Sequence, residues 1–194
     1  MPRAGLNSHD VAAAAAGLAD EIGIGGVTMG LLADRLGVKP PSLYKHVDSL
    51  ADVQHRVASL AMAELSELIR DAVQGRSGTD ALAAFMTAIR GYVLAHPGRY
   101  MATTGVEPHG PDDPLLAASD RVIGSLAAVL RGYGIAAGEM DHALRTVRST
   151  IHGFAVLEAS RGFQWAADTD ESFRWLITFV DRGLRASAPA ERSC

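Results

Sequence analysis

Six polar side chains near the N-terminus have the chemistry to hydrogen-bond nucleic acid. Lysine and serine reach the edges of bases, while tyrosine, histidine and threonine donate hydrogen bonds to phosphates. The sequence contains two lysines, and both belong to this group. The six candidates are Thr28, Lys39, Ser42, Tyr44, Lys45 and His46. The alternative interpretation is that the lysines are close by chance, that Tyr44 is a half-buried packing residue and that His46 is an ordinary surface residue.

Small and apolar residues around this group have the spacing of a helix-turn-helix. Ala33 lets two helices approach, Gly37 takes the left-handed turn conformation, and Leu43 locks the second helix onto the first. The inward face of that second helix needs only Leu43 and Val47, so its polar residues can enter a major groove about 12 Å wide. Ordinary helical packing produces similar spacing, and it is the polar residues that favour the DNA-binding interpretation.

Hydrophobic periodicity predicts an all-α fold. Apolar residues recur at intervals of three and four, and almost no segment alternates apolar and polar residues as a strand would. Asn7 or Ser8 is a suitable N-cap for the first helix, and the Pro40-Pro41 pair can begin the third. We expect about nine helices, over residues 7–21, 28–37, 40–47, 50–74, 80–96, 100–103, 114–133, 139–161 and 169–187.

Composition excludes several classes of protein. Of the 194 residues, 48% are hydrophobic and 21% charged, which is typical of a globular chain. The longest uncharged stretch, residues 22–33, is too short to span a bilayer, and no signal-peptide pattern is present. Cys194 is the single cysteine, so we expect no intrachain disulfide and a cytoplasmic location. The net charge of −4 argues against a nucleic-acid partner, but residues 35–47 contain no acid.

The sequence gives little support to an enzymatic function. The seven histidines form no His-x3-His or His-Glu-x-x-His pair that would place metal ligands on one helix face. Glu107 and His109 are the nearest approach to an acid–base pair, and Cys194 is a poor nucleophile candidate. We therefore expect no catalytic residues, no metal and no cofactor.

The segment Val27–Val47, which reads VTMGLLADRLGVKPPSLYKHV, resembles the DNA-binding domain of TetR-type transcriptional regulators. The resemblance covers about residues 7–60 and is strongest from Gly37 onward. Further along, Ile151-His152-Gly153-Phe154 is similar to the W-H-G motif region of one TetR-type ligand domain, with isoleucine in place of the tryptophan. The resemblance implies phosphate contacts by Thr28, Tyr44 and His46 and base contacts by Lys39, Ser42 and Lys45.

The same resemblance implies a DNA-binding domain at residues 1–49 and a ligand-binding and dimerisation domain at residues 50–194. It also implies a homodimer on a palindromic double-stranded operator. Many relatives carry a lysine at the start of the fourth helix, where this chain has Asp48, Ser49 and Leu50. We therefore expect lower nonspecific affinity for DNA and a shallower salt dependence.

A small-molecule effector would bind between the helices of residues 80–161. Aromatic, thioether and a few polar side chains in this region could line its pocket. The candidates are Phe85, Met86, Ile89, Tyr92, Tyr100, Met101, Arg121 and His152. The alternative for each is an ordinary core residue, and the loop Gly105–Pro114 could be a lid or a simple connection.

Two apolar stripes near the C-terminus fit a dimer interface in a four-helix bundle. They comprise Met140, Leu144, Val147 and Ile151 on one helix and Phe173, Leu176, Ile177, Val180 and Leu184 on the next. Both stripes could instead cover the core of their own protomer. The sequence thus predicts a dimeric repressor released by a small apolar or amphipathic molecule. The alternative is a helical small-molecule-binding or enzymatic protein whose N-terminal unit is only structural.

Overall fold

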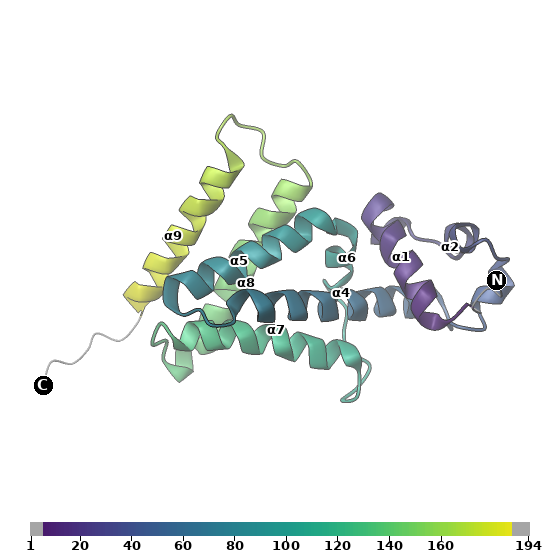
Figure 1. Ribbon diagram of the computed structural model, residues 1–194, viewed down its shortest axis with the longest axis horizontal. Coiled ribbons are helices and arrows are strands. Elements are labelled where there is room, and N and C mark those ends of the chain that lie inside the picture. Colours follow the sequence, from purple (N-terminus) through teal and green to yellow (C-terminus); the bar gives the residue numbers. More distant parts are fainter. Residues whose placement is uncertain (1–5, 188–194) are drawn as a thin grey trace, which may run out of the picture. The chain divides into compact units, whose positions relative to one another are not determined.

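The computed structural model describes residues 6–187, which fold into α-helices joined by turns and loops (Figure 1). The α-helices of this part of the chain are α1 (Ser8–Ile22), α2 (Met29–Leu36), α3 (Pro40–Leu43), α4 (Leu50–Val73), α5 (Gly78–Ala95), α6 (Pro97–Ala102), α7 (Pro114–Arg131), α8 (Met140–Ala159) and α9 (Thr169–Ser187). Two 3₁₀ turns, η1 (Ile24–Gly26) and η2 (Ala137–Glu139), precede α2 and α8. The predicted all-α fold is confirmed. None of these helices is long and apolar enough to cross a membrane. Cys194, the single cysteine, lies outside the described residues.

Most helix ends lie close to their predicted positions, and a side-chain cap accounts for the start of α1. The Asn7 side chain accepts a hydrogen bond from the Asp10 N–H at 3.0 Å, and the Asp10 carboxylate accepts one from the Asn7 N–H at 3.2 Å. This reciprocal pair is a capping box that starts α1. The third helix is shorter than predicted: it ends at Leu43, with Tyr44 as its C-cap at φ −67° and ψ −2°. Residues up to His46 continue as a turn.

The chain divides into two compact units that interleave in sequence. The first unit contains the residues up to Glu64 together with His96–Ser119, and the second contains Leu65–Ala95 together with the residues from Asp120 onward. Helices α4 and α7 each contribute to both units. The two units are therefore structural divisions, distinct from the functional division at residues 49 and 50, which stays a prediction.

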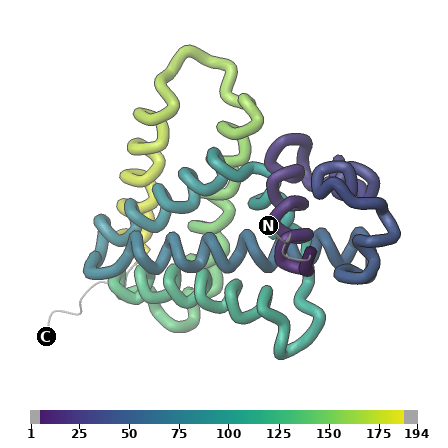
Figure 2. The backbone as a smooth tube through the Cα atoms, turned by 45° about the vertical axis from the view of Figure 1, so that its right-hand side comes forward, coloured from purple at the N-terminus to yellow at the C-terminus, as the bar shows by residue number. Residues whose placement is uncertain are grey.

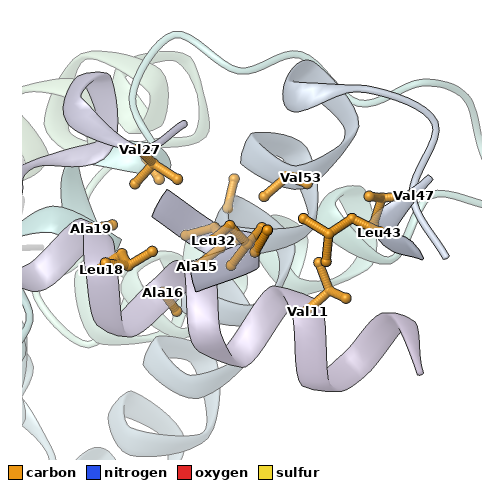
Figure 3. Packing of buried hydrophobic residues seen from close by; sticks show 14 of the residues in the cluster. Val11, Ala15, Ala16, Leu18, Ala19, Val27, Leu32, Leu43, Val47 and Val53 are labelled. Carbon is orange, nitrogen blue, oxygen red and sulfur yellow. The ribbon is translucent and has the colours of Figure 1, made fainter. Parts of the chain in front are cut away.

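The first unit is built on a core of valine, leucine and alanine side chains from α1 to α4. Leu32 and Leu43 are fully buried and come from the two helices on either side of the turn. Figure 3 shows them packed among Val11 of α1, Val47 and Val53. Alanines fill the inner face of α1, which allows the other helices to lie close to it. This core fixes the orientation of α3 relative to α2.

Helix α6 packs directly against α1 within the first unit. Gly98 is buried in this contact, and a Cβ at its position would meet the backbone of Ala19. The neighbouring Arg99 holds the two helices together, since its backbone N–H donates to Asp20 at 2.9 Å and its Nε lies 2.9 Å from the same carboxylate. Arg99 also reaches Glu64 of α4 at 3.2 Å.

The second unit buries its own apolar core, where α5 packs against both α8 and α9. Figure 2 shows α8 and α9 as neighbouring antiparallel helices joined by the segment 160–168. Arg90 of α5 donates two hydrogen bonds to Glu158 and one, at 2.6 Å, to Asp170. Hydrogen bonds to Glu158 and Asp170 outweigh burial and raise the pKa of Arg90 above its usual value. The guanidinium also lies 4.6 Å from the ring centre of Phe173, so this cation ties three helices of the unit together.

A second polar cluster in this unit centres on Asp181 of α9. Its carboxylate accepts hydrogen bonds from the hydroxyls of Thr79 at 2.7 Å and Tyr133 at 2.5 Å and from Nε of Arg185 at 3.0 Å. Burial raises the pKa of Asp181, but the three donors together lower it further, so that it lies below its ordinary range. Burial and the hydrogen bond to Asp181 raise the pKa of the Tyr133 phenol, which therefore remains a donor.

Candidate nucleic-acid interface

A left-handed glycine forms the turn between α2 and α3. Gly37 caps α2 with φ 66° and ψ 32°, a conformation that costs other residues about 1–2 kcal/mol. The N–H of Val38 then donates to the carbonyl of Ala33 at 3.0 Å, which satisfies one of the last acceptors of the helix. Ala33 itself is fully buried. The turn geometry predicted from Ala33, Gly37 and Leu43 is present.

Thr28 begins α2 and keeps a donor available for a phosphate. Its side chain oxygen accepts the N–H of Leu31 at 3.2 Å, as an N-cap does. Because the hydroxyl oxygen is the acceptor, its own proton can still be donated outward. The residue is exposed at the positive end of the helix dipole, a position that suits an anion.

Residues 39–47, which comprise α3 and the turn after it, present their polar side chains to solvent and are anchored by two apolar ones. Leu43 and Val47 are buried, whereas Tyr44 is 55% exposed. Lys39 and Lys45 are exposed as well, and Ser42 and His46 are partly exposed. Neither lysine forms an ion pair with any residue in the described part of the chain. All six candidates thus lie in one continuous segment, from the start of α2 to the end of the turn after α3.

Arg35 differs from the lysines because an acid neutralises it. Its guanidinium donates two hydrogen bonds to the carboxylate of Glu21 on α1, at 2.9 and 2.5 Å. The hydrogen bond lowers the pKa of Glu21 and raises that of Arg35. Although Arg35 belongs to the acid-free stretch of the sequence, in space it connects α1 to α2.

The predicted effector-binding residues lie mainly in the interior of their units. Phe85, Met86, Ile89 and Tyr92 are buried on α5, and Tyr100 is buried on α6, whereas Met101 is exposed and His152 is partly exposed. The four α5 residues belong to the second unit, while Tyr100 and Met101 belong to the first. Their role in binding a ligand stays a prediction.

Arg121 is the candidate that does line a pocket. It faces a cavity of about 470 Å³ in the second unit, between α4, α5 and α7, and its Nε lies 3.4 Å from the hydroxyl of Ser66. Apolar residues such as Val73 and Val129 form part of the wall. The charged residues around it are Glu67, Arg70, Arg76 and Arg121.

The predicted dimer stripes are partly used within one chain. Val147, Ile151, Phe173, Val180 and Leu184 are buried in the second unit, because an apolar stripe on a helix covers its own core first. Met140, Leu144, Leu176 and Ile177 remain partly accessible. The stripes as an interface therefore stay a prediction.

Sequence periodicity missed the exposed aromatic residues of α9. Trp175 and Phe179 are 66% and 61% exposed, and their rings stack with centroids 5.3 Å apart. Trp165, in the segment before α9, is exposed as well. The sequence did contain a signal for this surface, because Trp175 and Phe179 are large aromatic residues four positions apart that lie outside the core-facing stripe of the helix.

The comparisons with known proteins agree with this geometry. A family model described as "Tetracyclin repressor-like, C-terminal domain" matches residues 82–180. An uncharacterized HTH-type transcriptional regulator of Mycobacterium tuberculosis, Rv0681, is 35% identical over 96% of this chain and 83% of its own length. The regulator YobS of Bacillus subtilis is 32% identical over 94% of this chain and 95% of its own. The crystal structure of BioQ with its natural double-stranded DNA operator is 25% identical, with a TM-score of 0.68 over 94% of this chain and 99% of BioQ.

The relatives from Mycobacterium tuberculosis and Bacillus subtilis both match nearly the whole chain, and both are described as HTH-type transcriptional regulators. The family model covers residues 82–180, which lie C-terminal to the helix-turn-helix. With its N-terminal helix-turn-helix and its helical C-terminal region, the chain belongs to the TetR family of DNA-binding transcriptional regulators.

Proposed function

We propose that this regulator is a homodimeric repressor that acts in the cytoplasm and binds a palindromic double-stranded operator through residues 28–47. The observation that carries this proposal is the contrast within residues 39–47, which comprise α3 and the turn after it. Leu43 and Val47 anchor the segment in the core, whereas Tyr44 and both lysines remain exposed. A helix that served only the packing of the unit would gain nothing from these outward polar groups. The operator complex of the related BioQ supports the same use of the motif here.

Each side chain has a role that follows from its chemistry. The hydroxyls of Thr28 and Tyr44 and the imidazole of His46 donate to phosphates and set the position of the motif on the duplex. The long ammonium side chains of Lys39 and Lys45 reach acceptors on the base edges in the major groove. Two motifs in a dimer then read two half-sites about one helical turn apart.

Substitution of the phosphate-contacting residues tests the assignment. Tyr44→Phe and His46→Ala should each weaken operator binding by about 1–3 kcal/mol, or roughly 5- to 150-fold, because each removes a hydrogen bond to a charged group. The loss should be similar on operator and unrelated DNA, since phosphates carry no sequence information. Fluorescence anisotropy with a fragment of the protein's own promoter measures both.

His142→Ala provides the matched control, because His142 is an exposed histidine of α8 in the second unit. It should bind the operator with unchanged affinity. Wild-type affinity of both Tyr44→Phe and His46→Ala, in chains with unchanged thermal midpoints, would contradict the proposed interface.

We further propose that Trp175 and Phe179 form the centre of the homodimer interface on α9. Their stacked rings are the largest exposed aromatic surface on this helix, and aromatic residues are enriched at the centres of interfaces. The partly accessible Leu176 and Ile177 lie beside them on α9. A second copy of the chain would cover these side chains, which would otherwise remain in water.

The effector proposal rests on the pocket that Arg121 lines. Its wall combines apolar groups with three arginines and one glutamate, so the charged residues at this pocket sum to a net positive charge. Arg70 is paired with Glu67 and with Asp71, the latter at 2.8 Å, which leaves Arg76 and Arg121 to bind an anion. We infer that the effector is an amphipathic anion whose binding weakens operator affinity.

Filling this pocket tests the inference. Gly124 lines the cavity, and a Cβ added there meets no atom within 4 Å, so a side chain can start from this position. Gly124→Trp should bind the operator normally but lose the response to a probe such as decanoate, which should weaken operator binding in the wild type by about 5- to 150-fold. Gly91→Trp is the control, since Gly91 is an equally open helical glycine on α5 outside the cavity. An equal response in both variants would place the effector site elsewhere, and a wild type that ignores decanoate would contradict the proposed ligand class.

A further inference from the structure

Two histidines and an aspartate converge in the first unit, away from the proposed DNA-contacting residues. His55 lies on the second turn of α4, and His109 and Asp113 lie in the loop between α6 and α7. The His55 Nε2 is 2.8 Å from an oxygen of Asp113, and the two imidazole rings stack with centroids 3.7 Å apart. Each of the three residues offers one ligand atom, and these atoms all lie within 4.8 Å of one another.

The cluster is held in place by hydrogen bonds and by burial. The side chains of His55 and Asp113 are only 12% and 5% exposed. One carboxylate oxygen of Asp113 accepts the backbone N–H of His109 at 2.7 Å, and the other accepts that of Leu115 at 2.9 Å, where α7 begins. Two backbone donors therefore orient the carboxylate, as outer donors orient carboxylate ligands in metal sites.

We propose that His55, His109 and Asp113 bind a divalent transition metal of the Zn²⁺ class. Two imidazole nitrogens and one carboxylate oxygen suit zinc and its neighbours, whereas Mg²⁺ and Ca²⁺ prefer sets of oxygen ligands. Metal–ligand bonds of roughly 2.0–2.2 Å place tetrahedral ligand atoms about 3.3 Å apart. The 2.8 Å between His55 and Asp113 is shorter than that distance and the 4.8 Å limit for all three atoms is longer, so rotations of these side chains can form the site.

The metal takes the place of a proton in this cluster. Nε2 of His55 must be unprotonated to act as a ligand, so binding of the ion releases any proton held between this nitrogen and the Asp113 carboxylate 2.8 Å away. His109 is the exposed member, and its ring can rotate out of the stack to direct a nitrogen at the ion. The cluster also faces a cavity of about 750 Å³ in the first unit, which leaves a coordination position open to water.

Metal binding would fasten the loop before α7 to α4. The loop and the part of α4 that carries His55 both belong to the first unit. Helix α4 begins three residues after Val47, the last buried anchor of the proposed DNA-contacting residues 28–47. Because the unfolded chain does not hold the three ligands together, the ion should stabilise the folded unit in proportion to the logarithm of its concentration. This property does not depend on which operator or effector the regulator recognises.

Calorimetric titration of the full-length chain, produced without a polyhistidine tag, tests the site with ZnCl₂. The wild type should bind one equivalent of Zn²⁺ and should not bind Mg²⁺. His109→Ala should weaken Zn²⁺ binding at least about tenfold, while its thermal midpoint without metal stays near that of the wild type, since the side chain is exposed. His55→Gln should weaken binding similarly.

His142→Ala and His9→Ala are the controls, because both are exposed histidines outside the ligand set, and His9 borders the same cavity. Both variants should bind Zn²⁺ like the wild type. Replacement of Zn²⁺ by Co²⁺ should give the visible absorption bands of a tetrahedral site, and His109→Ala should lose them. The proposal is overturned if the wild type binds no stoichiometric Zn²⁺, if His109→Ala binds it equally well, or if His9→Ala abolishes binding.

Discussion

The contact between α6 and α1 gives the sharpest test of the fold. In the variant Gly98→Ala, the added methyl carbon would lie 1.7 Å from the carbonyl oxygen of Ala19, 2.1 Å from its carbonyl carbon and 2.6 Å from the nitrogen of Asp20. All three neighbours are backbone atoms of α1, so no side-chain rotation relieves the overlap. Because non-bonded atoms normally stay about 3.5 Å apart, α6 must retreat by about 1.5 Å or more.

That retreat has a calculable cost. Overpacking of a well-packed site costs about 1–3 kcal/mol. A shift of this size also breaks the 2.9 Å hydrogen bond from the Arg99 N–H to Asp20, a bond to a charged group worth about 1.5–3 kcal/mol. We therefore expect Gly98→Ala to lower the free energy of unfolding by about 3–5 kcal/mol. For a chain of this length, that corresponds to a fall in Tm of about 6–20 °C.

Thermal unfolding followed by circular dichroism measures the effect, with Gly91→Ala as the matched control. Gly91 lies within α5, and an added methyl group there contacts nothing. Its replacement by alanine should stabilise the helix by up to about 1 kcal/mol. The same substitution should thus have opposite signs at the two glycines. A Tm of Gly98→Ala within about 2 °C of the wild type would refute the close approach of α6 to α1.

Three further predictions concern the second unit and the DNA interface. Asp181→Asn should destabilise the chain by about 1.5–3 kcal/mol at pH 7, because it weakens the charged bonds to Tyr133. Folding lowers the pKa of Asp181, so the ionised carboxylate stabilises the folded chain above about pH 4. This stabilisation is lost as the pH falls through the pKa of the folded state. The Tm difference between the wild type and Asp181→Asn should therefore shrink at about pH 3. The double variant Trp175→Glu, Phe179→Glu should be a monomer in light scattering, whereas the control Ile123→Glu, at an exposed residue of α7, should remain a dimer. A double variant that is still dimeric would contradict the proposed interface. Although Lys39 and Lys45 are assigned to bases, they are the exposed cations without an ion pair in residues 28–47, so their charges should displace counterions from at most about 4 phosphates per dimer. Log K should therefore fall against log salt with a slope no steeper than about −3.6, and a slope beyond about −7 would contradict the proposed contacts.

Local rules in the sequence are enough to predict the helices and the turn of the DNA-binding motif. Asn7 with Asp10 forms the predicted kind of helix start, and Gly37 takes the left-handed conformation that its spacing indicated. These features depend on residues close together in the chain. For the same reason the sequence predicts that Leu43 and Val47 are the buried anchors, because these two apolar residues are four positions apart and the residues between them are polar or amphipathic.

Contacts between distant residues were not accessible in this way. The predicted helices leave residues 97–99 between them, but Pro97 begins α6 and Gly98 permits its approach to a helix 79 residues earlier in the chain, as the Asp20–Arg99 pair shows. The meeting of His55 with Asp113 likewise spans 58 residues. No periodicity reports such a pair, because a pattern shows which face of a helix is apolar and never which element covers it.

An acidic chain can bind DNA selectively when the charges near its binding surface differ from the charge of the whole molecule. Charge acts on a duplex only over about a Debye length, so the net charge of −4 matters less than the charges on the binding surface itself. On the proposed binding surface Glu21 neutralises Arg35, and the exposed Asp48 adds a negative charge just after it. Lys39 and Lys45 would therefore supply most of the local attraction. Because this attraction is small, nonspecific DNA competes weakly, and affinity for the operator must come from the hydrogen bonds that the helix-turn-helix positions.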